Sequence, residues 1–427
     1  MKKMILKQKN SQIQKDNMSL DKKIAFIFSR FPSISETYLS REINGLMKKG
    51  MPIIIFSLKN KKWEKIQSDA LEIEQKIQVI RCGYLFSMRV VMSNIYFILT
   101  NPKKYFQALI SVIKNSVKGG WITFIKNLIL FPKSVYYAYK IKKENITHIH
   151  AMHATYPTLT AYIIKILTKI PYSFAGHATD IYADTTMLGE KIKGSSFMIT
   201  CTGENVKYLS KCFRETVNKD IFLSYHGIKL DIFQFIEKRD FSNLKILSVG
   251  RIEKLKGHIY LIEACRLLKQ CNNNFQTIII GQGSLMNQIK DKIKKYGLED
   301  NVIITGALPY DEVIEYYRNS NIFVLPAIRK YQFGIPNVLI EAMATGLPVI
   351  TTRLSVVENE LIVDKTNGIL VNEKSPQEII EAIKYLSCNT VARKEIIFNA
   401  RKTVEDKFDF NKNIEKLYNI FYENIIY

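Results

Sequence analysis

The chain has 427 residues, of which 47% are hydrophobic and 24% are charged, and this globular composition excludes a chain that is disordered throughout. Its 62 basic and 39 acidic residues give a net charge of +23, which favours anionic partners. The length fits two domains of about 150–200 residues each. The six cysteines form no Cys-x-x-Cys pair, so we expect scattered thiols in a reducing, intracellular compartment.

Residues 1–22 are polar and rich in lysine, and their apolar patch Met4-Ile5-Leu6 is too short for a signal-peptide core. We expect a disordered basic tail there. A first domain is predicted at 23–235, because short buried-strand runs alternate with helical spacing. Its predicted strands are 24–28, 52–56, 146–150, 172–174, 197–200 and 221–223, and a helix is predicted at 36–49.

Residues 75–143 contain no aspartate or glutamate and combine lysines with aromatic residues. Their apolar runs fall short of the roughly 18 uncharged residues of a membrane-spanning helix. Basic amphipathic helices with aromatic edges suit an anionic membrane surface. An ordinary helical face of a lysine-rich protein is the alternative, and a nucleic-acid stripe is disfavoured because no recognised nucleic-acid module occurs. We therefore expect a cytoplasmic protein held peripherally at the inner face of the cell membrane.

A polar stretch at 236–243 is the predicted linker, and a second strand–helix series follows at 244–405. Residues 406–427 are predicted as a helix that packs back on the first domain. Repeated β–α units imply parallel sheets covered by helices. The predicted fold is α/β, with two Rossmann-like domains facing an interdomain cleft, and ligands bind beyond the carboxyl ends of such strands. The predicted strands are 245–249, 276–280, 302–305, 322–325 and 348–351, and the predicted helices are 258–270, 285–295, 311–319, 338–344 and 376–387.

The segment "ILSVGRIEKLKGHIYLIEA" (246–264) has the pattern of a strand, a loop and a helix. Arg251 follows the strand, and Lys256 stands at the start of the helix, where unpaired N–H groups and the helix dipole favour an anion. Two converging cations can clamp a diphosphate, and ordinary solvation of a loop is the alternative. In "IIIGQGSLMNQI", Gly281 and Gly283 fit a structural turn and a ligand loop equally well.

The segment "GIPNVLIEAMATG" (334–346) places one carboxylate, Glu341, among apolar residues. Asn337 is predicted to cap a helix that begins at Val338, and Glu341 then lies in the early turns of that helix. A buried, ionised carboxylate that faces a ligand accepts hydrogen bonds well, and a ribose supplies two hydroxyl donors. Pairing of Glu341 with a nearby lysine or arginine is the alternative.

Four of the six histidines lie in residues 148–182. His148 and His150 alternate as on a strand, and no cysteine or carboxylate set completes a zinc site beside them. His177 differs because it follows a predicted strand at its carboxyl end, next to Asp180, which we expect to cap or orient the loop. The chain contains no Asp-x-Asp pair. We therefore predict a site without a metal.

Several of these segments together resemble the donor-binding half of the family-4 retaining glycosyltransferases, which have the GT-B fold. The resemblance implies that Arg251 and Lys256 bind the diphosphate of a nucleotide-sugar donor and that Glu341 holds its ribose. It also implies that His177 lies beside the transferred sugar. The matching segments, which cover nearly all of residues 245–405, are "SVGRIEKLKGHIYLIEA", "IIIGQGS", "NIFVLPA", "GIPNVLIEAMATGLPVI" and "NGILV".

The resemblance recurs in the first domain, where "FSRFPSISETYLSREINGLMKKG" (28–50) is similar to the opening of the subgroup that builds exopolysaccharides of the colanic-acid type. By this resemblance Ser35, Glu36 and Thr37 form an acceptor loop that borders the catalytic centre. Ser35 and Glu36 also suit the start of a helix, so a role in capping alone is the alternative.

One position departs from the family. The family carries two glutamates eight positions apart, and here Phe333 stands at the first of them. Phenylalanine accepts no hydrogen bond, so the sugar contact is lost, is shifted to Gln332, or is made by the backbone N–H of Gly334 or Ile335. The loop at 351–362 also lacks the usual glycines, and both Glu358 and Glu360 are possible matches for the usual glutamate. The residues predicted to line the donor site beside Glu341 are Phe333, Gly334, Ile335, Asn337 and Val338.

The resemblance implies a retaining, metal-independent hexosyltransferase that needs no cofactor and has His177 and Glu341 as catalytic residues. It would transfer a sugar from a UDP- or GDP-sugar to a lipid-linked glycan intermediate of a cell-surface polysaccharide or capsule. Phe333 leaves a non-catalytic, nucleotide-sugar-binding partner subunit as the alternative, and an epimerase with this fold is a further one. A phosphorylase is disfavoured because no lysine context for pyridoxal phosphate is evident.

Overall fold

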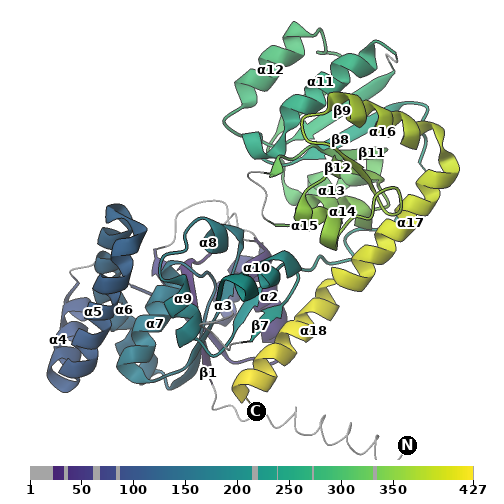
Figure 1. Ribbon diagram of the computed structural model, residues 1–427. Helices are drawn as coiled ribbons and strands as arrows, with labels where there is room; N and C mark the ends of the chain where they lie inside the picture. Colours follow the sequence, from purple (N-terminus) through teal and green to yellow (C-terminus); the bar gives the residue numbers. More distant parts are fainter. Residues whose placement is uncertain are drawn as a thin grey trace, which may run out of the picture. The chain divides into compact units, whose positions relative to one another are not determined.

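The computed structural model describes residues 23–32, 37–60, 68–82, 87–213, 220–237, 239–271, 274–329 and 334–426. The predicted tail at 1–22, Ser35 and Glu36 of the predicted acceptor loop, and Gln332 and Phe333 of the predicted donor site lie outside these ranges. The chain divides into two compact units (Figure 1). Unit 1 comprises Met1–Thr200, Val206–Phe222 and Leu417–Tyr427, and unit 2 comprises Cys201–Asn205 and Leu223–Lys416.

Unit 1 is built on a seven-stranded sheet with the strand order β3-β2-β1-β4-β5-β6-β7. The pairings from β3 to β6 are parallel. Residues 24–28 are buried along their whole length, which explains the unbroken apolar run of β1. This strand order is that of a doubly wound Rossmann sheet, whose ligands bind at the carboxyl ends of the strands. The strands are β1 (Lys23–Arg30), β2 (Ile53–Lys59), β3 (Val79–Arg81), β4 (Ile146–Ala151), β5 (Tyr172–Gly176), β6 (Met198–Thr200) and β7 (Ile221–Leu223).

The acid-free stretch forms three helices, α4 (Met88–Thr100), α5 (Pro102–Ser116) and α6 (Trp121–Lys143), which lie side by side (Figure 1). Tyr137 fixes the second half of α6 to the sheet, because its hydroxyl donates to the carbonyl of Ser57 (2.6 Å) and accepts from the N–H of Cys82 (2.8 Å). No helix in the described ranges is long and apolar enough to cross a membrane. The other helices of the first half are α2 (Thr37–Lys48), α3 (Ser68–Lys76), η1 (Val117–Gly119), α7 (Tyr156–Thr168), α8 (Ala178–Tyr182), α9 (Leu188–Gly194) and α10 (Gly203–Phe213).

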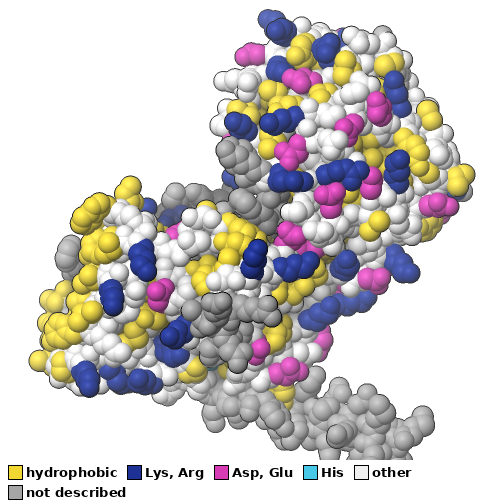
Figure 2. Space-filling view, viewed as in Figure 1, with side chains coloured by type: hydrophobic (Ala, Val, Ile, Leu, Met, Phe, Trp, Pro, Cys, Tyr) yellow, Lys and Arg dark blue, Asp and Glu magenta, His cyan; other side chains and the backbone are white. Residues whose placement is uncertain are grey.

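Helices α4, α5 and α6 leave many large apolar side chains in solvent. Met88, Leu99, Trp121 and Ile122 are 73, 75, 78 and 72% exposed, respectively. Figure 2 shows hydrophobic side chains gathered over this part of unit 1, with basic side chains among them. A soluble monomer rarely exposes so extended an apolar surface unless it is an interaction site. We call the solvent-facing side of residues 88–143 the apolar face.

Unit 2 is built on a six-stranded parallel sheet with the order β10-β9-β8-β11-β12-β13, which repeats the Rossmann order of unit 1. The predicted α/β fold with two Rossmann-like domains is confirmed. The strands are β8 (Leu244–Val249), β9 (Phe275–Ile280), β10 (Val302–Gly306), β11 (Ile322–Leu325), β12 (Val349–Thr352) and β13 (Ile369–Val371). The helices that follow are η2 (Lys254–Lys256), α11 (His258–Lys269), α12 (Met286–Lys295), α13 (Tyr310–Asn319), α14 (Asn337–Ala344), α15 (Ser355–Glu360), α16 (Pro376–Cys388), α17 (Thr390–Lys407), α18 (Phe410–Phe421) and a π-helical turn, Tyr422–Ile426.

The chain passes from unit 1 to unit 2 after Phe222, ahead of the polar stretch 236–243 that we predicted as the linker. Phe233 gives the physical reason, because it is fully buried in the core of unit 2. Its carbonyl also accepts a hydrogen bond from Arg401 Nη1 (2.8 Å). The segment before the polar stretch therefore belongs to the second core.

The last residues of the chain pack within unit 1. The ring of Phe421 lies with its centroid 4.8 Å from that of His150 and 5.7 Å from that of Phe26. Residues Leu417–Tyr427 are grouped with unit 1, whereas the first residues of α18 are grouped with unit 2. The predicted helix at 406–427 is therefore shared between the two units.

Candidate functional site

The loops after β8, β9 and β10 of unit 2 meet at the carboxyl edge of the sheet. Gly281 donates its N–H to the carbonyl of Gly306 (2.8 Å), and Gly250 donates to the carbonyl of Ile280 (2.9 Å). A Cβ at Gly281 would lie 2.0 Å from the carbonyl oxygen of Gly250, and one at Gly283 would lie 2.4 Å from that of Ile252. The close approach of these loops therefore requires glycine at both positions. This supports the structural role of Gly281 and Gly283, and their contact with a ligand stays a prediction.

Arg251 and Lys256 bring two positive charges to this edge. The side chain of Lys256 runs past Gly250, where a Cβ would lie 3.6 Å from its Cγ, Cδ and Cε. Burial, and then the charge of Arg251, lowers the pKa of Lys256 to about 8. Within the described ranges no carboxylate forms an ion pair with either cation. A half-buried ammonium beside a second cation is unfavourable on its own, so the pair suits an anion.

The nearest acidic residue along the chain has a structural role. The carboxylate of Glu253 accepts hydrogen bonds from the N–H (3.0 Å) and the hydroxyl (2.7 Å) of Ser284. These bonds, and to a lesser extent the charge of Arg251, lower the pKa of Glu253. Glu253 therefore ties the loop after β8 to the loop after β9, and its charge also acts on Arg251.

Lys256 ends the short helix η2, and Gly257, with φ of 67°, leads directly into α11. The predicted position of Lys256 at a helix N-terminus is confirmed. A Cβ at Gly257 would lie 1.8 Å from the carbonyl oxygen of Pro326, so the loop after β11 packs here too. Burial, and then the charge of Lys256, lowers the pKa of His258 to about 4. The imidazole of His258 is therefore neutral and adds no third charge to this edge.

Glu341 lies on α14 and is buried. The hydroxyl of Tyr310 donates to its Oε1 (3.0 Å), and the hydroxyl of Tyr317 donates to its Oε2 (2.9 Å). Two tyrosines are therefore partners of this carboxylate, and its contact with a ribose stays a prediction.

Tyr310 and Tyr317 are site residues that the sequence analysis missed. They lie two turns apart on the same side of α13, and burial, then Glu341, raises the pKa of Tyr317. The segment "YDEVIEYYRN" (310–319) held the signal, because two tyrosines seven positions apart on a helix share one face.

The prediction that Asn337 caps α14 is wrong. The helix begins at Asn337 itself, and the residue at the cap position is Pro336, which makes no side-chain cap bond. Pro336 has φ of −69° and precedes the helix without needing a backbone partner for its nitrogen. Ile335 and Val338 are half-buried against the core of unit 2, so they hold this loop in place.

In unit 1, His177 follows β5 and is oriented by Asp180. The carboxylate of Asp180 accepts from the N–H of Ala154 (3.0 Å) and the N–H of His177 (3.3 Å). The predicted role of Asp180 in orienting the loop is therefore confirmed. The imidazole ring of His177 has its centroid 5.2 Å from that of His153 and 5.6 Å from the ring of Tyr38. His153 is a neighbour that the sequence analysis did not single out.

His148 and His150 lie on β4, as predicted, and belong to the core. Both bond the hydroxyl of Ser173, through Nε2 of His148 (2.9 Å) and Nδ1 of His150 (2.8 Å). Burial lowers the pKa of His148 to about 3 and that of His150 well below its ordinary value. These rings are neutral structural groups. Thr37, the third residue of the predicted acceptor loop, begins α2.

Glu358 and Glu360 were both possible matches for the usual glutamate of the family's loop at 351–362, and the structure gives them different partners. Within unit 2, Glu360 accepts hydrogen bonds from the N–H of Gly203 (2.7 Å), the N–H of Glu204 (2.9 Å) and the hydroxyl of Tyr225 (2.8 Å). Glu358 instead pairs with Arg353 (3.2 Å). Glu360 is therefore the better connected of the two.

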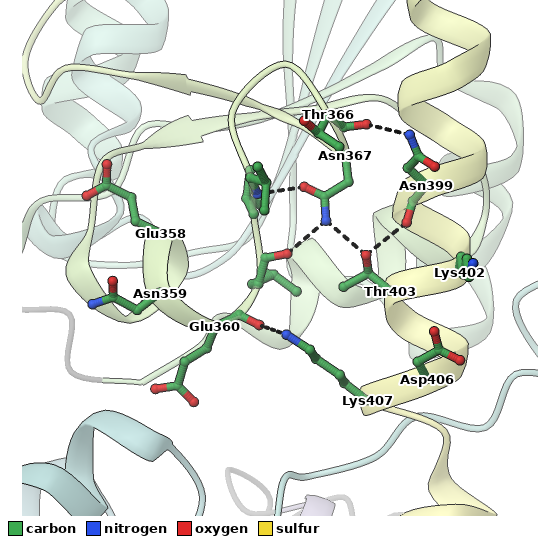
Figure 3. A pocket seen from close by; sticks show the side chains of 13 residues that line it. Glu358, Asn359, Glu360, Thr366, Asn367, Asn399, Lys402, Thr403, Asp406 and Lys407 are labelled. Carbon is green, nitrogen blue, oxygen red and sulfur yellow. Dashed lines mark hydrogen bonds between the residues drawn. The ribbon is translucent and has the colours of Figure 1, made fainter.

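A pocket of about 300 Å³ lies between the loop that carries these glutamates and α17 (Figure 3). Its polar groups bond one another: Asn367 donates to Thr403 Oγ1 (2.9 Å), and Lys407 donates to the carbonyl of Glu360 (3.0 Å). Asn399 similarly donates to the carbonyl of Thr366 (3.1 Å). The hydrogen bonds around this pocket therefore hold the loop against the helix.

Comparison with known proteins shows a family match for the second half of the chain. Residues 231–403 match the family model described as glycosyl transferases group 1. The amylovoran biosynthesis glycosyltransferase AmsK of Erwinia amylovora is 38% identical over 169 residues, which are 39% of this chain and 41% of that protein. The putative colanic acid biosynthesis glycosyltransferase WcaL of Escherichia coli is 34% identical over 175 residues, 40% of this chain and 42% of that protein. The matches thus span about two-fifths of each relative's length.

Solved structures extend the similarity to nearly the whole chain. Anabaena Alr3699/HepE in complex with UDP is similar with a TM-score of 0.69 at 14% identity, covering 94% of this chain and 100% of that chain. At this identity the similarity shows the fold alone. The predicted GT-B fold is confirmed, and so is the resemblance to glycosyltransferases of exopolysaccharide biosynthesis.

Proposed function

Because residues 231–403 form a glycosyl transferases group 1 domain, we propose that the protein is a glycosyltransferase of cell-surface polysaccharide biosynthesis. It takes a sugar from a UDP- or GDP-sugar and adds it, with retention and without a metal, to a lipid-linked glycan. The relatives named for amylovoran and colanic acid biosynthesis support the pathway class. The neighbour that holds UDP supports the donor class.

One observation carries the donor assignment. At the carboxyl edge of one Rossmann sheet, two cations that form no ion pair within the described ranges follow β8, and a buried carboxylate on α14 belongs to the same unit. A nucleoside diphosphate offers both matching groups, since its diphosphate suits Arg251 and Lys256 and its ribose diol suits Glu341. Gly334, Ile335, Asn337 and Val338 line the donor site in this proposal.

The chemistry follows from where charge develops. When the sugar leaves the donor, negative charge accumulates on the departing diphosphate. Arg251, Lys256 and the N-terminus of α11 stabilise that charge, which is the task of a metal ion in other transferases. The acceptor hydroxyl attacks the face from which the diphosphate departs: its bond to the sugar carbon forms as the bond from that carbon to the diphosphate breaks, and the departing phosphate oxygen takes the hydroxyl proton. His177, held by Asp180, is the proposed catalytic side chain of unit 1, and residues 35–37 are the proposed acceptor loop.

The acceptor and the location rest on unit 1. The apolar face combines exposed residues such as Trp121 with lysines and no acid, which suits an anionic membrane leaflet. A protein held peripherally at the inner face of the cell membrane meets a lipid-linked glycan there. This supports a lipid-linked acceptor over a soluble one.

A turnover assay tests the function. The purified protein is incubated with UDP- and GDP-sugars in EDTA, with a membrane extract as acceptor, and we expect release of UDP or GDP together with sugar in the lipid fraction. Lys256→Ala serves as the inactive control. Donor binding without release of nucleotide or transfer of sugar would favour the non-catalytic partner subunit. Phe333, which replaces the usual glutamate, is the sequence feature that suggests this alternative. Absence of donor binding would contradict the function altogether.

A further inference from the structure

A second cationic site lies at the carboxyl edge of the unit 1 sheet. A pocket of about 290 Å³ opens there, at the lower end of the range for small-molecule sites. The end of β2 contributes Leu58 and Lys59, α6 contributes Lys126 and Lys133, and Tyr156 stands at the first turn of α7. Ligands of doubly wound sheets bind at this edge, and the N-terminus of α7 favours an anion.

The charge in this pocket is of one sign. Lys126 and Lys133 lie two turns apart on α6, so their side chains emerge on the same side of the helix, and Lys59 joins them from the sheet. No carboxylate among the described residues lines the pocket. None of the three ammonium groups has a hydrogen bond or an ion pair in the described ranges. The charge of Asp184, which does not line the pocket, raises the pKa of Tyr156 after burial does.

Apart from Ser29 and Tyr156, the rest of the lining is apolar and continues onto the apolar face. Leu58 and Leu130 are buried in the pocket wall, and Ile129 is half exposed at its rim. Ile125 and Ile122 extend the same side of α6 from Ile129 by one and two turns, and both are exposed. A ligand that fits therefore carries a compact anionic group on a long apolar chain.

We propose that this three-lysine pocket binds the diphosphate of a lipid-linked acceptor, with the lipid chain lying along Ile129, Ile125 and Ile122. The inference rests on the proposed transfer to a lipid-linked glycan. Three cations match a diphosphate better than the single charge of a phospholipid headgroup. A nucleic acid is disfavoured because Tyr156 is the one aromatic residue among the described residues of the lining, which therefore offers no row of stacking platforms.

Vesicle binding separates the diphosphate from general membrane charge. The wild type is compared with Lys126→Gln/Lys133→Gln, and the matched control is Lys142→Gln/Lys143→Gln, which removes two exposed lysines from the last turn of the same helix. Phosphatidylcholine vesicles that contain undecaprenyl diphosphate are the probe. The pocket variant should bind them at least about tenfold more weakly than the control does. Lys59→Gln alone should weaken binding in the same direction.

Phosphatidylglycerol vesicles form the second arm of the experiment. Both double variants lose the same charge, so they should bind phosphatidylglycerol equally, within about twofold. Two outcomes overturn the pocket assignment. Either both double variants bind undecaprenyl diphosphate vesicles equally, or the pocket variant loses binding only to phosphatidylglycerol.

Calorimetry with UDP and GDP on the same proteins keeps the two proposals apart. If nucleotide binding is unchanged but the pocket and control variants bind undecaprenyl diphosphate vesicles alike, the pocket assignment alone is wrong. If the wild type binds no nucleoside diphosphate, the proposed function is wrong, whatever the vesicles show. Matching melting temperatures confirm that the variants are folded.

Discussion

The two units share one sheet topology and differ in what surrounds their cations. In unit 2, Arg251 and Lys256 lie at the carboxyl edge of a unit that also carries a buried carboxylate, which suits a small ligand with both an anion and a diol. In unit 1, Lys59, Lys126 and Lys133 line a partly apolar pocket beside exposed isoleucines, which suits an anion on an apolar chain. The same sheet topology therefore carries two different sets of side chains, and loop and helix residues rather than the fold decide which ligand each set suits.

The largest expected effect is the loss of one cation from unit 2. Lys256→Ala should weaken UDP or GDP binding by about 10- to 150-fold, because a charge-assisted bond to a phosphate contributes about 1.5–3 kcal/mol. Lys254→Ala, an exposed lysine in the same short helix, is the control and should leave affinity within about twofold. Isothermal titration measures both. Equal affinities of the two variants would remove Lys256 from the donor site.

In unit 1, the apolar face should govern membrane binding. Trp121→Ser/Ile122→Ser should lower flotation with anionic liposomes at least about tenfold, because each large apolar side chain contributes about 1.5–3 kcal/mol when it is fully buried in lipid. Val363→Ser, an exposed apolar residue of unit 2, is the control. UDP binding should not change in either variant. Flotation that is unaffected by the double substitution would make the exposed apolar residues irrelevant to the membrane.

The role of Glu341 can be tested with a modified ligand. Wild-type protein should prefer UDP over 2′,3′-dideoxy-UDP by about tenfold, since the carboxylate accepts hydrogen bonds from the ribose diol. Glu341→Gln should bind both ligands nearly alike. Tyr310→Phe, which removes one hydroxyl but keeps the carboxylate, should retain the preference for UDP. A preference that survives in Glu341→Gln would leave the carboxylate a structural partner of the tyrosines.

The smallest effect is a pH dependence. The pKa of Lys256 is about 8 in the free protein, and a bound diphosphate raises it because the negative charge favours the ammonium form. Binding therefore takes up a proton above pH 8, and affinity falls as pH rises through 8, by about twofold from pH 8 to 8.5. Titrations in buffers of different ionisation enthalpy report the proton. The dependence should disappear in Lys256→Ala, and its persistence there would assign it to another group.

The sequence predicted the local features well and the long-range partners poorly. Arg251 and Lys256 could be placed because strand, loop and helix follow one another within 246–264. The hydroxyls that bond Glu341 come from α13, and the three lysines of unit 1 come from β2 and α6. Tertiary packing brings those groups together, so no local pattern shows them.

Local patterns also failed where packing decided the boundary. Phe233 looked like the end of the first domain, yet it fills the core of unit 2. Helix α17 was not predicted because few of its residues are apolar, and it buries Ile396, Ile397, Ala400 and Val404. Asn337 was predicted as a cap on residue type alone, while Pro336 takes that position.

The most direct test of the donor site is a titration of the wild-type protein with UDP and with GDP in excess EDTA. The site in unit 2 predicts binding of at least one of them without a divalent metal, with the nucleoside monophosphate at least about tenfold weaker because one phosphate is missing from the two cations. Binding that appears only after Mg²⁺ or Mn²⁺ is added, or equal binding of the monophosphate, would contradict a diphosphate clamp made by Arg251 and Lys256.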